Sequence, residues 1–153
     1  MLINPVAEQK EAYEFLVELF KYMIDQLIPG TKVSDVYNKV VEFVKSAGKE
    51  DHLKHLPKIM GYGIGLSRKE DLLSIKADNE RVIEDGMVFN IRLSLANFDN
   101  RPNRNCLLIA DTVIVQNGAP DILTKENPKA YADISYQIDE NEDELPEDAR
   151  KSD

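Results

Sequence analysis

The chain has 153 residues, of which 42% are hydrophobic and 31% charged. This composition excludes a collagen-like or wholly disordered chain and is typical of one globular domain, with or without a tail. No apolar run approaches the ~20 residues that span a bilayer, and the first residues show no secretory signal, so we expect neither a membrane span nor secretion. Cys106 is the only cysteine, which excludes an intrachain disulfide and favours a reducing compartment.

Two helices are predicted at the start of the chain. Apolar residues recur at helical spacing between Val6 and Ile28, with Asn4 as the expected N-cap and Pro29-Gly30 as the stop. A second helix is predicted from Ser34, its expected N-cap, to Gly48. Because the connection is a short turn, the two helices should pack together as a hairpin.

Strands are predicted after the helices. Residues 87–97 alternate between apolar and polar side chains, and residues 106–115 form a second long strand that should run antiparallel to the first. Shorter strands are expected at 72–76 and 122–123. Two helices followed by several strands predict an α+β domain, with helices on one face of a mostly antiparallel sheet.

The charge is unevenly distributed. The chain carries 28 acidic and 19 basic residues, a net charge of −9. Residues 137–153 hold eight acidic and two basic residues, so this stretch carries −6 and residues 1–136 carry −3. We therefore predict a folded domain over residues 1–136 and an acidic tail or linker over residues 137–153. The tail is either a solvated spacer or an attractant for a basic partner such as a histone. Net acidity argues against binding of bare nucleic acid.

The Gly61–Gly65 run, GYGIG, is the most unusual local sequence. Alternating glycines in a strand permit a bend or the close approach of another backbone or a ligand. The run fits neither a dinucleotide fingerprint nor a phosphate loop, because neither a following helix nor a GK[ST] sequence is present.

Few residues suggest catalysis. His52 and His55 share a possible helical face, but a catalytic metal usually needs three protein ligands, so two solvated histidines in a polar loop are the simpler interpretation. Cys106 lies among apolar residues and is expected to be a small buried hydrophobe. Arg92 stands on the polar face of its strand, and Asp111 on the next strand is a possible partner across the sheet, depending on register.

The order of helix, Pro-Gly turn, helix, GxGIG, GMVFNI and a final long strand resembles the C-terminal half of the pita-bread fold. This fold is shared by methionine aminopeptidase, prolidase and creatinase, and the resemblance runs from about Asn4 to Thr124. It implies a curved, mostly antiparallel sheet covered by helices. It also implies that this chain is the C-terminal lobe of a longer protein. We expect the sheet edge left open by missing strands to be covered by the chain's own termini or by self-association.

The resemblance also implies which positions bound metal in the enzymes. The family's histidine in the glycine run corresponds to Tyr62. A second family histidine, which contacts substrate and comes just before a Glu, corresponds to Lys69, which is followed by Glu70. The family's first Glu ligand corresponds to Arg92, and the last falls at Ala110 or Asp111. The two Asp ligands would lie before the first helix. A guanidinium repels divalent cations, so we expect neither metal nor cofactor, and we expect no peptidase activity.

Within the metal-free branch of this fold, GYGIGLSRKE, MVFNIRLSLANF and LLIADTVIV resemble the large subunits of the FACT histone chaperone. The resemblance implies a non-catalytic nuclear module that binds histones H3–H4 and acts on chromatin in transcription, replication and repair. A smaller HMG-type subunit would bind through other domains. The former active-site pocket would comprise Tyr62, Lys69, Glu70, Arg92 and Asp111.

Two alternatives remain open from the sequence. One is an active metal-dependent aminopeptidase or prolidase that residues outside this chain complete. The other is a metal-free relative that binds RNA or ribosomes, against which the acidic tail argues.

Overall fold

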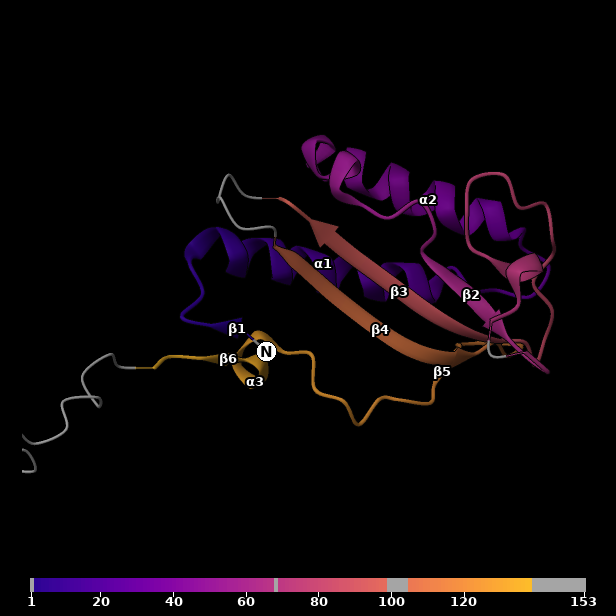
Figure 1. Cartoon of the computed structure of the whole chain (residues 1–153). Coiled ribbons are helices and arrows are strands. Elements are labelled where there is room, and N and C mark those ends of the chain that lie inside the picture. Colours follow the sequence, from indigo (N-terminus) through magenta and orange to yellow (C-terminus); the bar gives the residue numbers. More distant parts are fainter. Residues whose placement is uncertain (1, 68, 99–104, 139–153) are drawn as a thin grey trace, which may run out of the picture.

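The computed structural model describes residues 2–67, 69–98 and 105–138. Helices α1 (Ala7–Asp25) and α2 (Val33–Ser46) cover one face of a four-stranded antiparallel sheet (Figure 1). The strand order is β2-β3-β4-β5, formed by β2 (Gly61–Ile64), β3 (Val88–Ala96), β4 (Cys106–Ile114) and β5 (Asp121–Ile122). The predicted α+β architecture is confirmed, and so is the antiparallel pairing of the two long strands.

Smaller elements connect and close this core. The 3₁₀ helices η1 (Glu50–His55) and η2 (Asp71–Leu73) precede and follow β2. After β5 the chain returns along α1 through the short helix α3 (Tyr131–Ile134) to β6 (Ser135–Tyr136). There β6 pairs in parallel with β1 (Leu2–Ile3), so the N-terminal strand lies beside the end of the described chain (Figure 1).

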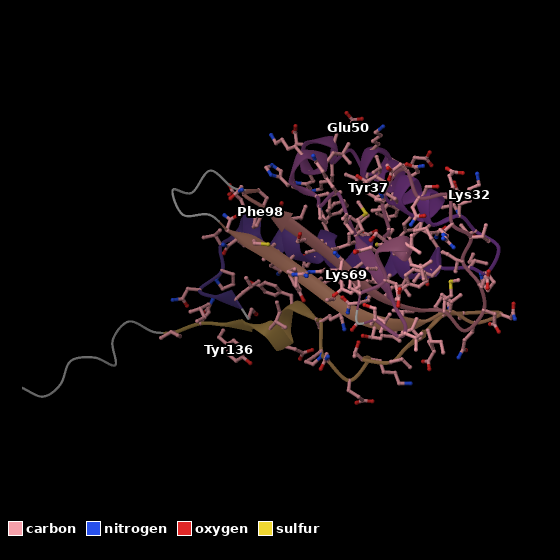
Figure 2. All side chains as sticks on the ribbon, turned by 45° about the vertical axis from the view of Figure 1, so that its right-hand side comes forward. Lys32, Tyr37, Glu50, Lys69, Phe98 and Tyr136 are labelled. Atoms are coloured by element: carbon pink, nitrogen blue, oxygen red, sulfur yellow. The ribbon has the colours of Figure 1, made fainter. Side chains whose placement is uncertain are left out.

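Strand alternation places the core between the helices and the sheet. Odd-numbered residues of β3 and β4 face the helices and are buried, and the side chains of both layers fill the space between them (Figure 2). The predicted apolar stripe is buried throughout and supplies the opposite wall, with Leu27 just beyond the end of α1 at Asp25: Ala12, Phe15, Leu16, Leu19, Phe20, Met23 and Leu27. Burial of each large side chain contributes about 1.5–3 kcal/mol. Even-numbered residues of β3 and β4 therefore form the opposite, outer face.

Both predicted N-caps are wrong, because distant partners determine the local backbone. Helix α1 starts after Val6, while Asn4 adopts φ 44° and its side-chain oxygen accepts a hydrogen bond from the Ile138 amide at 2.8 Å. Helix α2 starts after Lys32. Ser34 lies inside its first turn, buried, and donates its backbone N–H to the Asn79 carbonyl at 2.9 Å.

The strand predicted at 72–76 is wrong as well. Residues 71–73 form η2, and only Ile75 exchanges backbone hydrogen bonds with the residues around β2, to Met60 and Gly61, each at 2.9 Å. The buried Asn79 side chain turns the chain away, because its amide donates to the carbonyls of Leu72 and Ser74 at 3.1 and 2.7 Å.

The glycine run is explained by close packing within the chain. A Cβ on Gly61 would lie 2.7 Å from the Asn90 carbonyl oxygen, and one on Gly63 would lie 2.7 Å from the Leu73 Cβ. Both distances are too short for real atoms. The close approach that the alternating glycines permit is therefore to the chain's own β3 and η2.

We predict that Gly63→Ala lowers the free energy of unfolding by about 1–3 kcal/mol, the usual cost of overpacking. The matched control is Gly65→Ala, because its Cβ would meet only the far end of the Glu70 side chain, at 3.2 Å. Urea unfolding followed by circular dichroism measures both. Equal destabilisation by the two substitutions would contradict the role assigned to Leu73.

Candidate functional site

A groove lies on the outer face of the sheet, away from the helices. It has a volume of about 400 Å³ and is lined by Pro57, Ile59, Gly61, Tyr62, Lys69, Arg92, Ser94, Cys106 and Leu108. We call this the outer-face groove. It brings together three of the five predicted site residues, Tyr62, Lys69 and Arg92, although they come from β2, the segment after it, and β3.

The strand register fixes the arrangement within the groove. Tyr62 on β2 is paired with Asn90, and Arg92, two residues further along β3, is paired with Ala110. Arg92 is exposed and makes no ion pair with any residue that the structure describes. The Lys69 ammonium lies 3.1 Å from the exposed Asp71 carboxylate. The lining of the groove therefore carries a phenol and two cationic side chains, of which Lys69 is paired with Asp71 beside the groove.

No carboxylate faces outward from β2, β3 or β4. The outward residues of these strands are Tyr62, Ile64, Val88, Asn90, Arg92, Ser94, Ala96, Cys106, Leu108, Ala110, Thr112 and Ile114. Asp121 on β5 is the nearest outward acid in the sheet, beside Ile114. Across residues 2–67, 69–98 and 105–138, no group of three or more His, Cys, Asp or Glu side chains is placed to hold a metal ion.

Asp111 belongs to the other face, so its predicted pairing with Arg92 is wrong. Asp111 is paired with Ile91, and Ala110 is the residue opposite Arg92. Because side chains alternate along a strand, this difference of one residue turns Asp111 toward the helices, where it is 3% exposed. Of the two positions considered for the family's last Glu, only Ala110 lies on the face of Tyr62 and Arg92.

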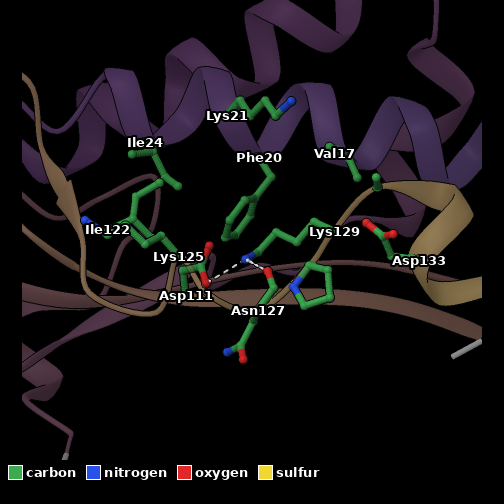
Figure 3. A pocket seen from close by; sticks show the side chains of 12 residues that line it. Val17, Phe20, Lys21, Ile24, Asp111, Ile122, Lys125, Asn127, Lys129 and Asp133 are labelled. Carbon is green, nitrogen blue, oxygen red and sulfur yellow. Dashed lines mark hydrogen bonds and ion pairs between the residues drawn. The ribbon is translucent and has the colours of Figure 1, made fainter.

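The buried Asp111 carboxylate has two partners from the chain that follows β5. Its Oδ1 accepts a hydrogen bond from the Thr124 hydroxyl at 2.7 Å. The same oxygen lies 2.9 Å from the Lys129 ammonium, an ion pair that Figure 3 shows. Residues 123–138, which we call the C-terminal strap, are thereby attached to the sheet. The Tyr13 hydroxyl attaches the strap to α1 by donating to the Lys129 carbonyl at 3.0 Å.

A second cavity, of about 410 Å³, lies between α1, Asp111 and the strap. Lys21, Lys125 and Asp133 lie at its margin, and Phe20 and Ile24 form its apolar wall (Figure 3). Sequence reasoning missed this arrangement. The signal was present, because Asp111 stands in the same alternating set as Leu107, Ile109 and Val113.

Glu70 lies outside the outer-face groove. Its Oε1 accepts a hydrogen bond from the Ser67 amide at 2.9 Å, and its backbone pairs with Gly63. It lines a different cavity, of about 360 Å³, together with Arg81, Leu72 and Met87. Its contacts give it a role in holding the turn after β2.

The two histidines and the cysteine differ from the prediction in their burial. His52 and His55 lie in η1 and are half-buried, not solvated in a loop. The His52 ring packs 5.6 Å from the Phe15 ring, and burial lowers its pKa, as does the nearby Lys49 charge. His55 Nδ1 lies 2.8 Å from the Ala96 carbonyl oxygen. Cys106 is exposed, because its even position on β4 faces outward.

Comparison with known protein families matches residues 1–117 to metallopeptidase family M24. The chain belongs to family M24. The fold agrees, because an X-Pro aminopeptidase from Thermotoga maritima superposes with a TM-score of 0.71 at 18% identity, over 90% of this chain and 35% of that chain. This identity supports the shared M24 fold alone.

Among M24 relatives, this chain is similar to subunits of the FACT complex. The FACT complex subunit SPT16 of Zea mays is 37% identical over 93% of this chain, and that of Arabidopsis thaliana is 34% identical over 94%. The N-terminal domain of SPT16 from Cicer arietinum superposes with a TM-score of 0.80 at 34% identity, over 88% of this chain and 32% of that domain. The chain spans about 14% of the length of the curated relatives.

Within residues 2–67, 69–98 and 105–138, none of the helices combines the length and the apolar character of a membrane-spanning segment.

We predict that Asp111→Ala lowers the free energy of unfolding by about 3 kcal/mol, near the lower end of the cost of breaking a buried ion pair. The lower end of this range applies because the Lys129 side chain is 21% exposed to water. Replacing both partners, with Asp111→Leu and Lys129→Met, should recover most of the lost free energy of unfolding.

The control is Asp121→Ala, which removes an exposed ion pair with Lys125 at 3.9 Å and should lower the free energy of unfolding by less than about 1 kcal/mol. Thermal and urea unfolding measure each variant, and an equal cost for Asp111→Ala and Asp121→Ala would refute the role of the buried pair.

Proposed function

We propose that this chain is a non-catalytic, histone-binding module of a FACT-type chaperone that acts on chromatin in the nucleus. The similarity to SPT16 N-terminal domains supports this assignment, and so does the chemistry of the outer face. Its partners would be histones H3–H4 and, through other parts of the assembly, the smaller FACT subunit. The active peptidase, the alternative drawn from the sequence, finds no support in the arrangement of side chains.

The observation that carries the proposal is the absence of carboxylates from the outer face of β2, β3 and β4. Family resemblance assigns metal ligands to the positions of Tyr62, Arg92 and Ala110, which all face outward. A phenol, a guanidinium and a methyl group do not supply the ligand set of a histidine and two glutamates. Without a bound metal, no water is activated for attack on a peptide bond. Asp111 supplies no replacement, because its carboxylate is buried on the opposite face and bound to Lys129.

The groove could still hold an extended segment, and its charge would select which one. Arg92 and Lys69 favour a neutral or acidic segment and disfavour a lysine-rich histone tail. We therefore assign the attraction of basic histones to the acidic residues 137–153, whose net charge of −6 exceeds that of the other 136 residues together. Residues 139–153 lie outside the described structure, so this assignment rests on charge.

Restoring the family's metal-ligand residues tests whether their loss explains the expected absence of metal binding. We predict that the natural chain binds Co²⁺ and Mn²⁺ in less than equimolar amounts and does not cleave Met- or Xaa-Pro peptides. The triple variant Tyr62→His, Arg92→Glu and Ala110→Glu places one histidine and two glutamates on one face and should bind Co²⁺ measurably. Isothermal titration and elemental analysis provide the readouts. Equimolar metal and peptide turnover in the natural chain would overturn the proposal.

Removing the tail tests the source of histone attraction. We predict that deletion of residues 137–153 weakens binding to H3–H4 at least tenfold at low salt and flattens the salt dependence, because screening acts on exposed charge. The control Arg92→Ala should change affinity less than twofold. Fluorescence titration at several salt concentrations measures both. If the deletion changes affinity less than twofold, the histone contacts lie in the folded domain.

A further inference from the structure

The cavity between α1 and the C-terminal strap, which we call the strap cavity, has the dimensions of a ligand site. Its volume of about 410 Å³ lies within the roughly 300–1,000 Å³ of ligand pockets. Phe20 and Ile24 form its apolar wall, and the half-buried Val17 and Ile122 add apolar surface that water can reach. The cavity lies on the helix side of the sheet, which Asp111 also faces, so it is separate from the outer-face groove.

Two lysines at the margin of the strap cavity are available to bind an anionic group. Lys21 on α1 is exposed and forms no ion pair with any residue that the structure describes. Lys125 is also exposed, and the carboxylate beside its ammonium, that of Asp121, is 3.9 Å away. Lys129 is different, because it already neutralises the buried Asp111. The cavity therefore suits a ligand that joins an apolar side chain to acidic groups.

The chain itself contains a segment of this chemistry. Residues 139–153 include one large apolar side chain, Leu145, within the sequence EDELPED of residues 142–148. Three acidic residues precede the leucine directly, and two more follow the proline after it. Leu145 is therefore the residue of this segment that can fill an apolar cavity, and its neighbours carry the charge that lysines attract.

The length of the segment allows Leu145 to return to the strap cavity. Asp133 lines the cavity, and Ile138, the last described residue, follows it by five positions. An extended chain covers at most about 3.6 Å per residue, so Ile138 lies within about 18 Å of Asp133. Leu145 follows Ile138 by seven positions, which can span about 23–25 Å. The reach of the segment therefore exceeds the distance back to the cavity.

We propose that Leu145 occupies the strap cavity of its own chain, with the flanking acidic groups beside Lys21 and Lys125. Asp133 lies on the α3 side of the cavity, whereas Lys125 lies on the β5 side (Figure 3). Repulsion by Asp133 therefore directs the acidic groups toward the two lysines. Because the segment is tethered, its effective concentration at the cavity is on the order of millimolar. A contact too weak to hold a free peptide can thus hold this segment.

This docking would regulate the attraction of histones, a consequence that rests on the proposed function. Acidic groups beside Lys21 and Lys125 are partly neutralised, so a free tail presents more negative charge than a docked one. A basic partner would bind the free tail preferentially and thereby withdraw Leu145 from the cavity.

A tryptophan reporter tests the docking, because the chain contains no Trp of its own. Leu145→Trp should emit at a shorter wavelength than Ala149→Trp and be less accessible to acrylamide, because only its ring leaves water for an apolar cavity. Ala149→Trp is the matched control, since it places the same ring in the same tail four positions later. Equal wavelengths and equal quenching for the two variants would overturn the proposal.

Charge reversal tests the site. Combining Lys21→Glu and Lys125→Glu with Leu145→Trp should shift the emission to the wavelength of the matched control, because attraction becomes repulsion. The pair Lys45→Glu and Lys58→Glu changes the net charge equally at exposed lysines that do not line the cavity, and it should leave the emission unchanged. Thermal unfolding followed by circular dichroism establishes that both forms fold. Short-wavelength emission that survives reversal at the cavity would overturn the assigned site.

Addition of histones and dilution separate the remaining outcomes. H3–H4 should shift the Leu145→Trp emission to longer wavelength. A docked tail that H3–H4 leaves in place would contradict the attraction of histones by the tail and would leave the strap cavity assigned. For docking within one chain, the emission should not change over about a hundredfold dilution, because the contact is intramolecular. A shift to longer wavelength on dilution would assign the segment to a second copy and overturn the intrachain contact.

Discussion

The burial of alternate side chains of β3 and β4 against α1 determines which residues of the sheet can take part in chemistry. Leu93, Leu95 and Ile109 are among the odd-numbered residues whose burial holds the two layers together. A shift of one residue in either strand would expose that apolar set to water, so the register is strongly specified. The even-numbered residues, Arg92 and Ala110 among them, are consequently displayed together on the outer face.

The same constraint explains why a carboxylate lies in the core. Asp111 occupies an inward position among apolar residues, and an unpaired charge there would be costly. Lys129 and Thr124 supply the partners, and both belong to the C-terminal strap. The pair thus couples the strap to the sheet, while the β1–β6 pairing and the Asn4 contacts with Ile138 close the two described ends of the chain upon each other.

The sequence was sufficient for the features that depend on periodicity. The apolar stripe of α1, the two long antiparallel strands and the outward position of Arg92 follow from local spacing. The sequence was insufficient where contacts with distant residues determine the local structure. Asn4 and Ser34 have the chemistry of helix caps, yet their partners are Ile138 and Asn79. Likewise, Tyr62, Lys69 and Arg92 could be assigned to one groove by resemblance, but the face of Asp111 required the register of β4.

By the family resemblance, Arg92 stands at the position of a metal ligand, and this would change the source of positive charge on the outer face. In the metal-dependent enzymes that this fold resembles, carboxylates would hold divalent cations there. A guanidinium provides a fixed positive charge without any ligand and cannot activate water. Under the proposed function, such a face would still orient a carbonyl or carboxylate of an extended segment. Residues 137–153 carry the opposite sign of charge, so under the proposed function attraction of a basic partner would be physically separate from selection of a segment by the groove.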